Sequence, residues 1–385
     1  MKKILIIFIS YFLFCLNVYA QEDFAPNAKS AILMDQETEK VLFSKNENEK
    51  LPPASMTKLA SMLVIMETID AGKLKFSDEV TISEKSASMG GSQVFLEAGE
   101  VYTVEELLKS IAIASGNDAV VAMAEKISGS EEEFVKLLNR RMKEIGANNT
   151  NFVNAHGLDT DNHLSTAKDM AIIALNLLKH DRILKYTSIY EEYLEKKDGN
   201  KTWLVNTNKL VRFYDGVDGL KTGFTKNAGY CLTATAKKNN FRLISVVMGE
   251  DTTESRSKDT INMLNYGFNT FKINTIKTKD EILGRVRVEG GKKDYVNLVL
   301  TKNATELLKI TDKKEKYSFK LKVNTITAPV KKGDIVGSSE IIDKDGNIVD
   351  EVELTINENI YKANLKDYLL KNIKTISGGK VIVKQ

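Results

Sequence analysis

The chain has 385 residues, of which 42% are hydrophobic and 28% charged, and 55 Lys and Arg residues nearly balance 52 Asp and Glu residues. This length predicts two or three domains, and the hydrophobic fraction excludes a chain that is disordered throughout. A net charge of +3 argues against a nucleic-acid partner, because nucleic-acid binders usually carry a strongly basic domain.

The first twenty residues resemble a secretory signal peptide. Two lysines precede an apolar segment at residues 4–16, and residues 18–20 read Val-Tyr-Ala, which is typical of a signal-peptidase site. The apolar segment is short for a membrane span of about 20 residues, although an uncleaved anchor is the alternative interpretation. We expect a mature chain that starts at residue 21 and acts outside the cytoplasm, in a periplasm or on the outer face of the cytoplasmic membrane.

Removal of residues 1–20 leaves one cysteine, Cys231, so no disulfide can form within the mature chain. Its neighbours Tyr230 and Leu232 predict a buried strand position rather than a reactive thiol. The cysteines and histidines lack zinc-site spacing, and neither GxGxxG nor GxxxxGK[ST] occurs. We therefore expect no metal and no cofactor, which leaves serine, lysine and backbone groups for any chemistry.

The mature chain begins with strand patterns and continues with helix patterns. Residues 31–35 and 41–44 predict two strands, and the apolar segment at residues 54–69 predicts a helix that is buried on most sides. Capping-box patterns at Thr103 with Glu106 and at Ser130 with Glu133 open two further helices, and another is expected from about Thr166 to Lys179.

Strand patterns return after residue 205, with three short strands expected at residues 217–224, 230–236 and 242–248. Their tight connections predict an antiparallel sheet, and a final helix at residues 257–271 would cover it. Strands, then helices, then strands again predict the fold class α+β, in which helices cover an antiparallel sheet. We assign residues 21–273 to this domain.

Residues 274–360 predict a second, small all-β domain, because short alternating segments are separated by glycine-containing turns. These segments lie at residues 282–288, 296–300, 317–323 and 352–356. The tail at residues 361–385 carries an apolar stripe at helical spacing, from Tyr361 to Ile376, with lysines beside it. Binding to a membrane surface and docking on its own domain are the two interpretations of this tail.

Three short motifs point to chemistry only when they are taken together. SxxK occurs four times, at Ser55, Ser165, Ser255 and Ser377. On a helix this spacing places serine and lysine on one face, where a deprotonated lysine can activate the hydroxyl. Ser165 and Ser255 come where helices are predicted to begin, so we interpret them as caps.

SxN occurs twice, at residues 44–46 and 115–117, and KTG occurs once, at residues 221–223. Only one ordered set of the three motifs can be drawn, and it consists of Ser55-Met-Thr-Lys58, Ser115-Gly-Asn117 and Lys221-Thr222-Gly223.

This set resembles that of penicillin-recognising serine enzymes. With SGN in place of SDN, and with the surrounding residues 53–58, 114–119, 156–158 and 218–225, it is similar to the low-molecular-mass penicillin-binding proteins that are D-alanyl-D-alanine carboxypeptidases. The resemblance runs from about Phe24 to Phe271, and the following β domain fits the same layout. It implies that the chain removes the terminal D-alanine from peptidoglycan stem peptides ending in D-Ala-D-Ala, and that β-lactam antibiotics inhibit it.

The resemblance also implies a role for each motif residue. Ser55 would be the nucleophile, Lys58 its general base, and Ser115 a proton relay to the leaving amine. Asn117 would bind a substrate amide, and the backbone N–H groups of Ser55 and Phe224 would form the oxyanion hole. The remaining substrate-binding residues would be Lys221, Thr222, Gly223 and Arg256, of which Arg256 has a plain surface arginine as its alternative interpretation.

Two other functions compete with this one. A serine β-lactamase shares the three motifs, but its commonest class carries a deacylating Glu in an ExxLN pattern, which residues 118–220 lack. A cell-wall binding module without catalysis is the other alternative, and it would have no need of Ser55, Lys58 and Lys221 together.

Overall fold

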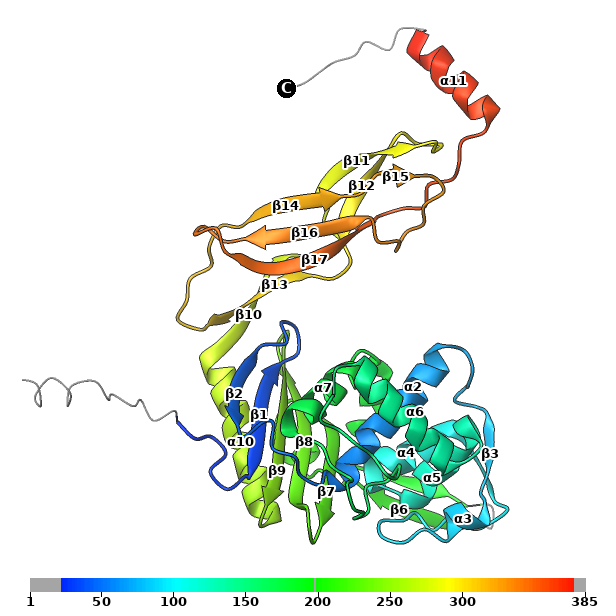
Figure 1. Cartoon of the computed structure of the whole chain (residues 1–385), viewed down its shortest axis with the longest axis vertical. Helices are drawn as coiled ribbons and strands as arrows, with labels where there is room; N and C mark the ends of the chain where they lie inside the picture. The colour runs from blue at the N-terminus through cyan, green and yellow to red at the C-terminus, as the bar shows by residue number, and fades with distance from the viewer. Residues whose placement is uncertain (1–21, 197–198, 377–385) are drawn as a thin grey trace, which may run out of the picture. The chain divides into compact units, whose positions relative to one another are not determined.

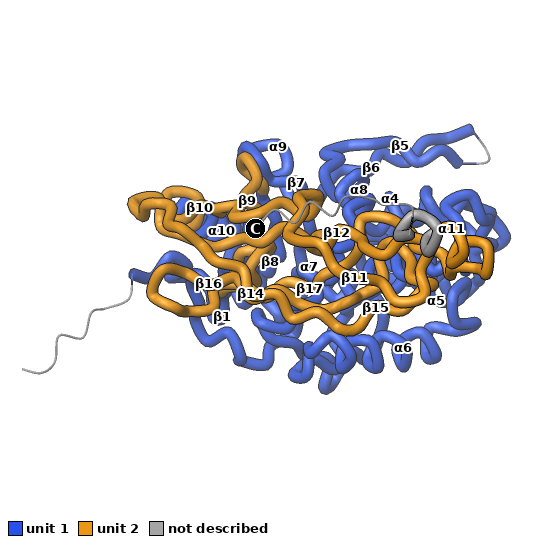
Figure 2. The backbone as a smooth tube through the Cα atoms, turned by 90° about the horizontal axis from the view of Figure 1, so that it is seen from above, with its two compact units in different colours: residues 1–34, 41–236, 243–266 blue, residues 35–40, 237–242, 267–385 orange. Residues whose placement is uncertain are grey.

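The computed structural model describes residues 22–196 and 199–376 (Figure 1). The predicted signal peptide and the end of the tail lie outside these residues. The chain divides into two compact units, distinguished by colour in Figure 2. The first is formed by Met1–Met34, Val41–Ala236 and Leu243–Tyr266, and the second by Asp35–Lys40, Lys237–Arg242 and Gly267–Gln385.

The first unit is built on a five-stranded sheet in the order β2-β1-β9-β8-β7. The strands are β1 (Ser30–Asp35), β2 (Val41–Lys45), β7 (Val217–Thr225), β8 (Gly229–Lys238) and β9 (Phe241–Glu250). Residues 231–236 of β8 are buried without alternation, as expected of a strand covered on both faces. Helix α10 lies on one side of the sheet, and helices α2, α4, α5, α6 and α7 lie on the opposite side (Figure 1). The expected α+β class is therefore confirmed.

Helices and two small hairpins make up the rest of the first unit. The helices are η1 (Ala54–Thr57), α2 (Lys58–Asp70), α3 (Glu84–Ala87), α4 (Val104–Ala114), α5 (Asn117–Ser128), α6 (Glu131–Glu144), α7 (Ala167–Leu177), η2 (Asp181–Ile183), α8 (Leu184–Thr187), α9 (Leu210–Phe213) and α10 (Thr253–Thr270). The hairpins pair β3 (Glu79–Thr81) with β4 (Val101–Thr103), and β5 (Glu191–Glu195) with β6 (Lys201–Val205).

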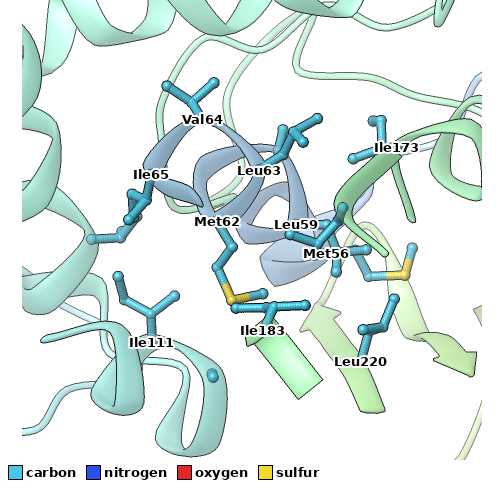
Figure 3. Close-up of a cluster of buried hydrophobic side chains, with 14 of the residues drawn as sticks. Met56, Leu59, Met62, Leu63, Val64, Ile65, Ile111, Ile173, Ile183 and Leu220 are labelled. Atoms are coloured by element: carbon cyan, nitrogen blue, oxygen red, sulfur yellow. The ribbon is translucent and has the colours of Figure 1, made fainter. Parts of the chain in front are cut away.

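Helix α2 lies at the centre of the core (Figure 3). Residues 58–66 are all buried, which confirms the prediction of a helix apolar on most sides. Met62 and Leu63 are completely enclosed, and Ile111, Ile173 and Ile183 reach the same cluster from other elements. Each such side chain contributes roughly 1.5–3 kcal/mol to folding, so α2 and the motif at its start are held firmly.

The capping predictions are confirmed in part. Thr103 and Glu106 form the reciprocal capping box of α4, and Ser130 accepts a hydrogen bond from the Glu133 N–H at the start of α6. Thr166 caps α7, which begins at Ala167.

Of the two expected serine caps, Ser255 is confirmed and Ser165 is wrong. The Ser165 backbone pairs with Leu51 and its hydroxyl contacts Thr150, so Ser165 lies outside the helix that follows it. Helix α10 begins at Thr253, four residues before the predicted start, because Thr252 and Ser255 bond reciprocally there.

The second unit is all-β, as predicted. Its strands are β10 (Phe271–Lys277), β11 (Gly284–Glu289), β12 (Tyr295–Leu300), β13 (Ala304–Lys309), β14 (Ser318–Val323), β15 (Ile326–Thr327), β16 (Gly337–Ile342) and β17 (Ile348–Ile356). Six of them form one sheet in the order β14-β16-β17-β12-β11-β15, and β10 pairs with β13. A separate apolar core that includes Val296, Ile341 and Leu354 holds the unit together.

The predicted tail helix is present as α11 (Leu365–Ile376). Tyr361, Leu365, Tyr368 and Leu369 are all exposed, between 46% and 78%, so these side chains are not packed as docking on their own domain would require. Among the described residues, no helix is long and apolar enough to cross a membrane.

Candidate active site

Ser55 lies in the 3-10 turn η1, directly before α2. Two glycines pack directly against the backbone of this turn, where a side chain would not fit. A Cβ at Gly157 would stand 1.9 Å from the Ala54 carbonyl oxygen, and one at Gly223 would stand 2.7 Å from the Pro53 carbonyl oxygen. The resemblance implies that Gly223 binds substrate, and the structure places it both in the lining of the cleft and against the turn that carries Ser55. It therefore also helps to position Ser55.

The Lys58 side chain is completely buried, and its Nζ has three close neighbours. It lies 2.6 Å from Asn117 Oδ1, 2.7 Å from the His156 carbonyl oxygen and 3.0 Å from Ser55 Oγ. A neutral amine has two N–H groups and one lone pair. Because the two carbonyl oxygens can only accept, they take both hydrogens and leave the lone pair facing the Ser55 hydroxyl.

The protonation state of Lys58 follows from its surroundings. Burial, and next the charge of Lys221, lower the pKa of Lys58 well below its usual value, against a weaker opposing effect of Asp118. Burial, and then the charge of Arg256, lower the pKa of Lys221 to about 7. Because each buried cation disfavours protonation of the next, the three together favour the neutral amine that a general base requires.

The SGN motif lies where α4 ends and α5 begins. Ser115 has a left-handed backbone (φ +65°), and its buried Oγ has no hydrogen-bond partner among the described residues. Asn117 accepts a hydrogen bond from Lys58 Nζ through its Oδ1 and donates from Nδ2 to the Gly90 carbonyl oxygen. Asn117 therefore orients Lys58 here, and the expected contact of its side chain with a substrate amide stays a prediction.

The KTG strand β7 and helix α10 bring two buried cations together. Lys221 and Arg256 are 1% and 7% exposed, and no carboxylate in the described part of the chain lies within ion-pair distance of either. The alternative of a surface arginine is therefore wrong for Arg256. Thr222 beside them donates its hydroxyl to Thr207 Oγ1 at 2.6 Å. This corner of the site is suited to an anion.

These groups open on a cleft of about 600 Å³ in the first unit. Its lining residues are Ser55, Ser92, Ser115, Thr207, Lys209, Leu210, Phe213, Thr222, Gly223, Phe224, Tyr230, Thr253, Glu254, Arg256 and Ser257. The structure thus brings Ser55, Ser115 and both Thr222 and Gly223 to one cleft, with Arg256 beside them. The Phe224 ring is half exposed and stacks on Tyr230 at 4.3 Å between ring centroids.

Sequence reasoning missed the residues that support the site from behind. The buried carboxylate of Asp118 accepts hydrogen bonds from the Val94 and Leu96 N–H groups, which holds the loop that follows Ser92. His163 accepts from the Val153 N–H through Nδ1, so its protonated Nε2 donates to Thr57 Oγ1 at 2.8 Å, next to Lys58. A buried Asp inside an apolar helix was the only sequence signal for Asp118.

Two family models match consecutive parts of the chain. Residues 17–252 match the family described as D-alanyl-D-alanine carboxypeptidase (Peptidase_S11), and residues 271–362 match the penicillin-binding protein 5 C-terminal domain. The chain is 46% identical to D-alanyl-D-alanine carboxypeptidase DacF of Bacillus subtilis, over 97% of this chain and 98% of that protein.

Two solved structures are also similar. Penicillin-binding protein 5 from Haemophilus influenzae is 30% identical, with a TM-score of 0.71 over 90% of this chain and 100% of that one. Penicillin-binding protein D2 from Listeria monocytogenes in its ampicillin-bound form is 30% identical, with a TM-score of 0.57 over 66% of this chain and 99% of that one.

Proposed function

The chain belongs to the peptidase S11 family of D-alanyl-D-alanine carboxypeptidases, and we propose that it removes the terminal D-alanine of peptidoglycan stem peptides through an acyl-enzyme on Ser55. The observation that carries this proposal is the contact between Ser55 Oγ and the buried amine of Lys58 at 3.0 Å. Nucleophile and base within hydrogen-bond reach are the mark of an activated serine.

In the first step Ser55 Oγ attacks the carbonyl carbon of the penultimate D-alanine. Its proton passes to the Lys58 lone pair, and the backbone N–H groups of Ser55 and Phe224 stabilise the oxyanion. Loss of a single such donor typically costs about 3 kcal/mol. Ser115 then relays the proton to the leaving nitrogen, so the C–N bond breaks to give free D-alanine and an ester on Ser55. Water hydrolyses this ester and regenerates the hydroxyl.

Selection of a free carboxylate is assigned to Lys221, Thr222 and Arg256. Two buried cations without an acidic partner are unfavourable by themselves, and the terminal carboxylate of the peptide would compensate them. The same corner would take the carboxylate of a β-lactam, which acylates Ser55 in place of the peptide. The ampicillin-bound Listeria structure supports a β-lactam as inhibitor.

We further assign an extracytoplasmic location. The signal-peptide pattern at residues 1–20 supports secretion, and the exposed apolar side chains of residues 361–370 support contact between the tail and a membrane surface. A variant that ends before Tyr361 should then be lost from membrane pellets. Retention of this variant in the pellet would contradict the anchoring role.

The family assignment disfavours both alternatives from the sequence, a β-lactamase and a binding module without catalysis. The decisive experiment measures D-alanine released from a soluble peptide ending in D-Ala-D-Ala, by mature wild type and by Ser55→Ala. We expect release by wild type alone. Release by both proteins would mean that another residue is the nucleophile, and release by neither would reject the carboxypeptidase.

A further inference from the structure

The β5–β6 hairpin presents two large aromatic side chains side by side. Tyr193 and Trp203 are directly opposed across the two strands, and they are 57% and 58% exposed. On the other face of the hairpin, Leu194 and Leu204 are buried in the core of the first unit. The face with the two leucines therefore packs on the core, and the face with Tyr193 and Trp203 is exposed. Figure 2 shows the hairpin at the margin of this unit.

The hairpin is connected to the catalytic cleft by both of its strands. After β6 the chain reaches Thr207, which lines the cleft and accepts the Thr222 hydroxyl. Beyond β5, Lys196 Nζ donates to the Phe95 carbonyl oxygen at 2.6 Å, in the loop that follows the cleft residue Ser92. Trp203 and Thr207 are four positions apart in the chain, so their Cα atoms lie at most about 14 Å apart.

The size and surroundings of the aromatic pair limit what it can bind. Two partly exposed aromatic rings offer at most a few hundred Å², whereas a stable protein interface needs about 800 Å² on each partner. Charged residues flank the pair, with Glu195 and Lys201 joined in an ion pair at 2.6 Å. Protein interfaces are depleted of charge at their centre. A flat ligand with one weakly polar face fits better, and a sugar ring has such a face, whose C–H groups meet the negative face of an aromatic ring.

We propose that Tyr193 and Trp203 bind a sugar ring of the glycan strand that carries the stem peptide. This inference rests on the proposed function, because a peptide attached to a glycan is what brings a sugar near the cleft. An extended peptide of four residues covers about 14 Å, which is enough to span the upper limit on the separation between the Cα atoms of Trp203 and the cleft residue Thr207. The pair would then favour peptides that are still attached to sugar.

Fluorescence offers a direct test, because Trp203 is the only tryptophan of the chain. Mature Ser55→Ala protein, which should bind without turnover, is titrated with a disaccharide-peptide ending in D-Ala-D-Ala and with the same peptide lacking sugar. We expect the disaccharide-peptide to change the tryptophan emission and the free peptide to leave it unchanged. Equal responses to both, or no response to the disaccharide-peptide, would overturn the proposal and leave the pair to a protein partner.

Kinetics separate this proposal from the proposed function. Tyr193→Ala and Trp203→Ala should each lower kcat/KM about two- to tenfold on the disaccharide-peptide and leave it unchanged on the free peptide, which also shows that the variants are folded. Tyr295→Ala removes a similarly exposed aromatic ring, 48% exposed, from strand β12 of the second unit and should change neither value. Equal losses on both substrates would reject the sugar site, while failure of wild type on the free peptide would reject the carboxypeptidase itself.

Discussion

The two parts of the chain before and after residue 267 carry net charges of opposite sign. Residues 21–266 carry 30 Lys and Arg against 36 Asp and Glu, whereas residues 267–385 carry 23 against 16. Near neutrality of the whole chain therefore conceals an acidic catalytic part and a basic β-rich part. A basic C-terminal part agrees with a tail that approaches an anionic membrane surface.

Burial sharpens the contrast. The catalytic unit encloses charged side chains of both signs, and those at most 7% exposed include Lys58, Asp118, Lys221, Glu250, Arg256 and Asp259. From Phe271 onward, within the described residues, Glu340 is the one charged side chain that is buried, and both Lys320 and Lys322 pair with it. Enclosed charge without a close partner of opposite charge lowers stability, so we expect Lys221 and Arg256 to lower the stability of the catalytic unit, whereas Glu340 in the β unit is paired.

The largest effect should come from Lys58→Met, which removes the enclosed base and the penalty for burying it. We expect kcat/KM on the D-Ala-D-Ala peptide to fall by about 10³-fold or more, while thermal unfolding of the catalytic unit moves upward. Lys168→Met, at an exposed helix lysine, should change neither quantity. A loss of stability in Lys58→Met would contradict the view that this lysine is retained for catalysis.

Glycine substitutions test whether the backbone is packed more tightly at the Ser55 turn than in a turn of the β unit. Gly157 has φ +91° and no room for a Cβ beside Ala54, so Gly157→Ala should destabilise the catalytic unit by about 3 kcal/mol or more. Gly346 in the β unit has φ +87° with open space around it, and Gly346→Ala should cost about 1 kcal/mol. Calorimetric unfolding of the two variants measures the difference, and equal costs would argue against the tight contact at the catalytic turn.

The variant Arg256→Gln tests whether the buried cations Lys221 and Arg256 bind the C-terminal carboxylate of the peptide. Loss of one charged hydrogen bond should lower kcat/KM about 10- to 100-fold on a peptide with a free C-terminal carboxylate. The loss should largely disappear on the same peptide with a C-terminal amide. Arg140→Gln, at an exposed arginine of α6, serves as the control. Equal losses on both peptides would assign Arg256 a structural role.

The smallest effect should be on the pH dependence of stability, to which two buried glutamates contribute with opposite sign. Burial, and in addition Asp259, raise the pKa of Glu250 to about 7, so the folded state retains a proton that the unfolded state releases. Its contribution to stability is therefore lost as pH rises from about 4.5 to 7. Lys322 and then Lys320 lower the pKa of Glu340, so its contribution is lost as pH falls instead.

Relative to wild type, Glu250→Gln should therefore gain stability between pH 5 and pH 8, whereas Glu340→Gln should be less stable than wild type at pH 8. Unfolding temperatures of both variants at the two pH values provide the measurement. Shifts of the same sign would contradict the difference in how the two units bury charge.

The sequence predicted the strands of the main sheet, five helices of the first unit and the residues that a short motif marks, but not helix α5 or the hairpins β3–β4 and β5–β6. The apolar pattern after Pro53 identified α2 because a buried helix needs apolar residues on every side, and SxxK, SxN and KTG each led to a residue at the cleft. The supporting contacts could not be predicted in this way. Gly157 and His163 act on the catalytic turn from a distant segment, and the burial of Arg256 depends on how α10 packs on the sheet. Ser165 and Thr166 are both good caps by composition, and only the pairing of Ser165 with Leu51 decides between them.

The enclosed Cys231 in β8 has one further consequence. It is opposite Gly223 of β7, fully buried, and burial raises its pKa to about 11. In a chain that starts at residue 21, Cys231 is the only thiol, so we expect an alkylating reagent to modify such a chain only when the strand that carries KTG separates from β8. The rate of this modification therefore reports how often the catalytic sheet opens, and a ligand held against β7 should slow it.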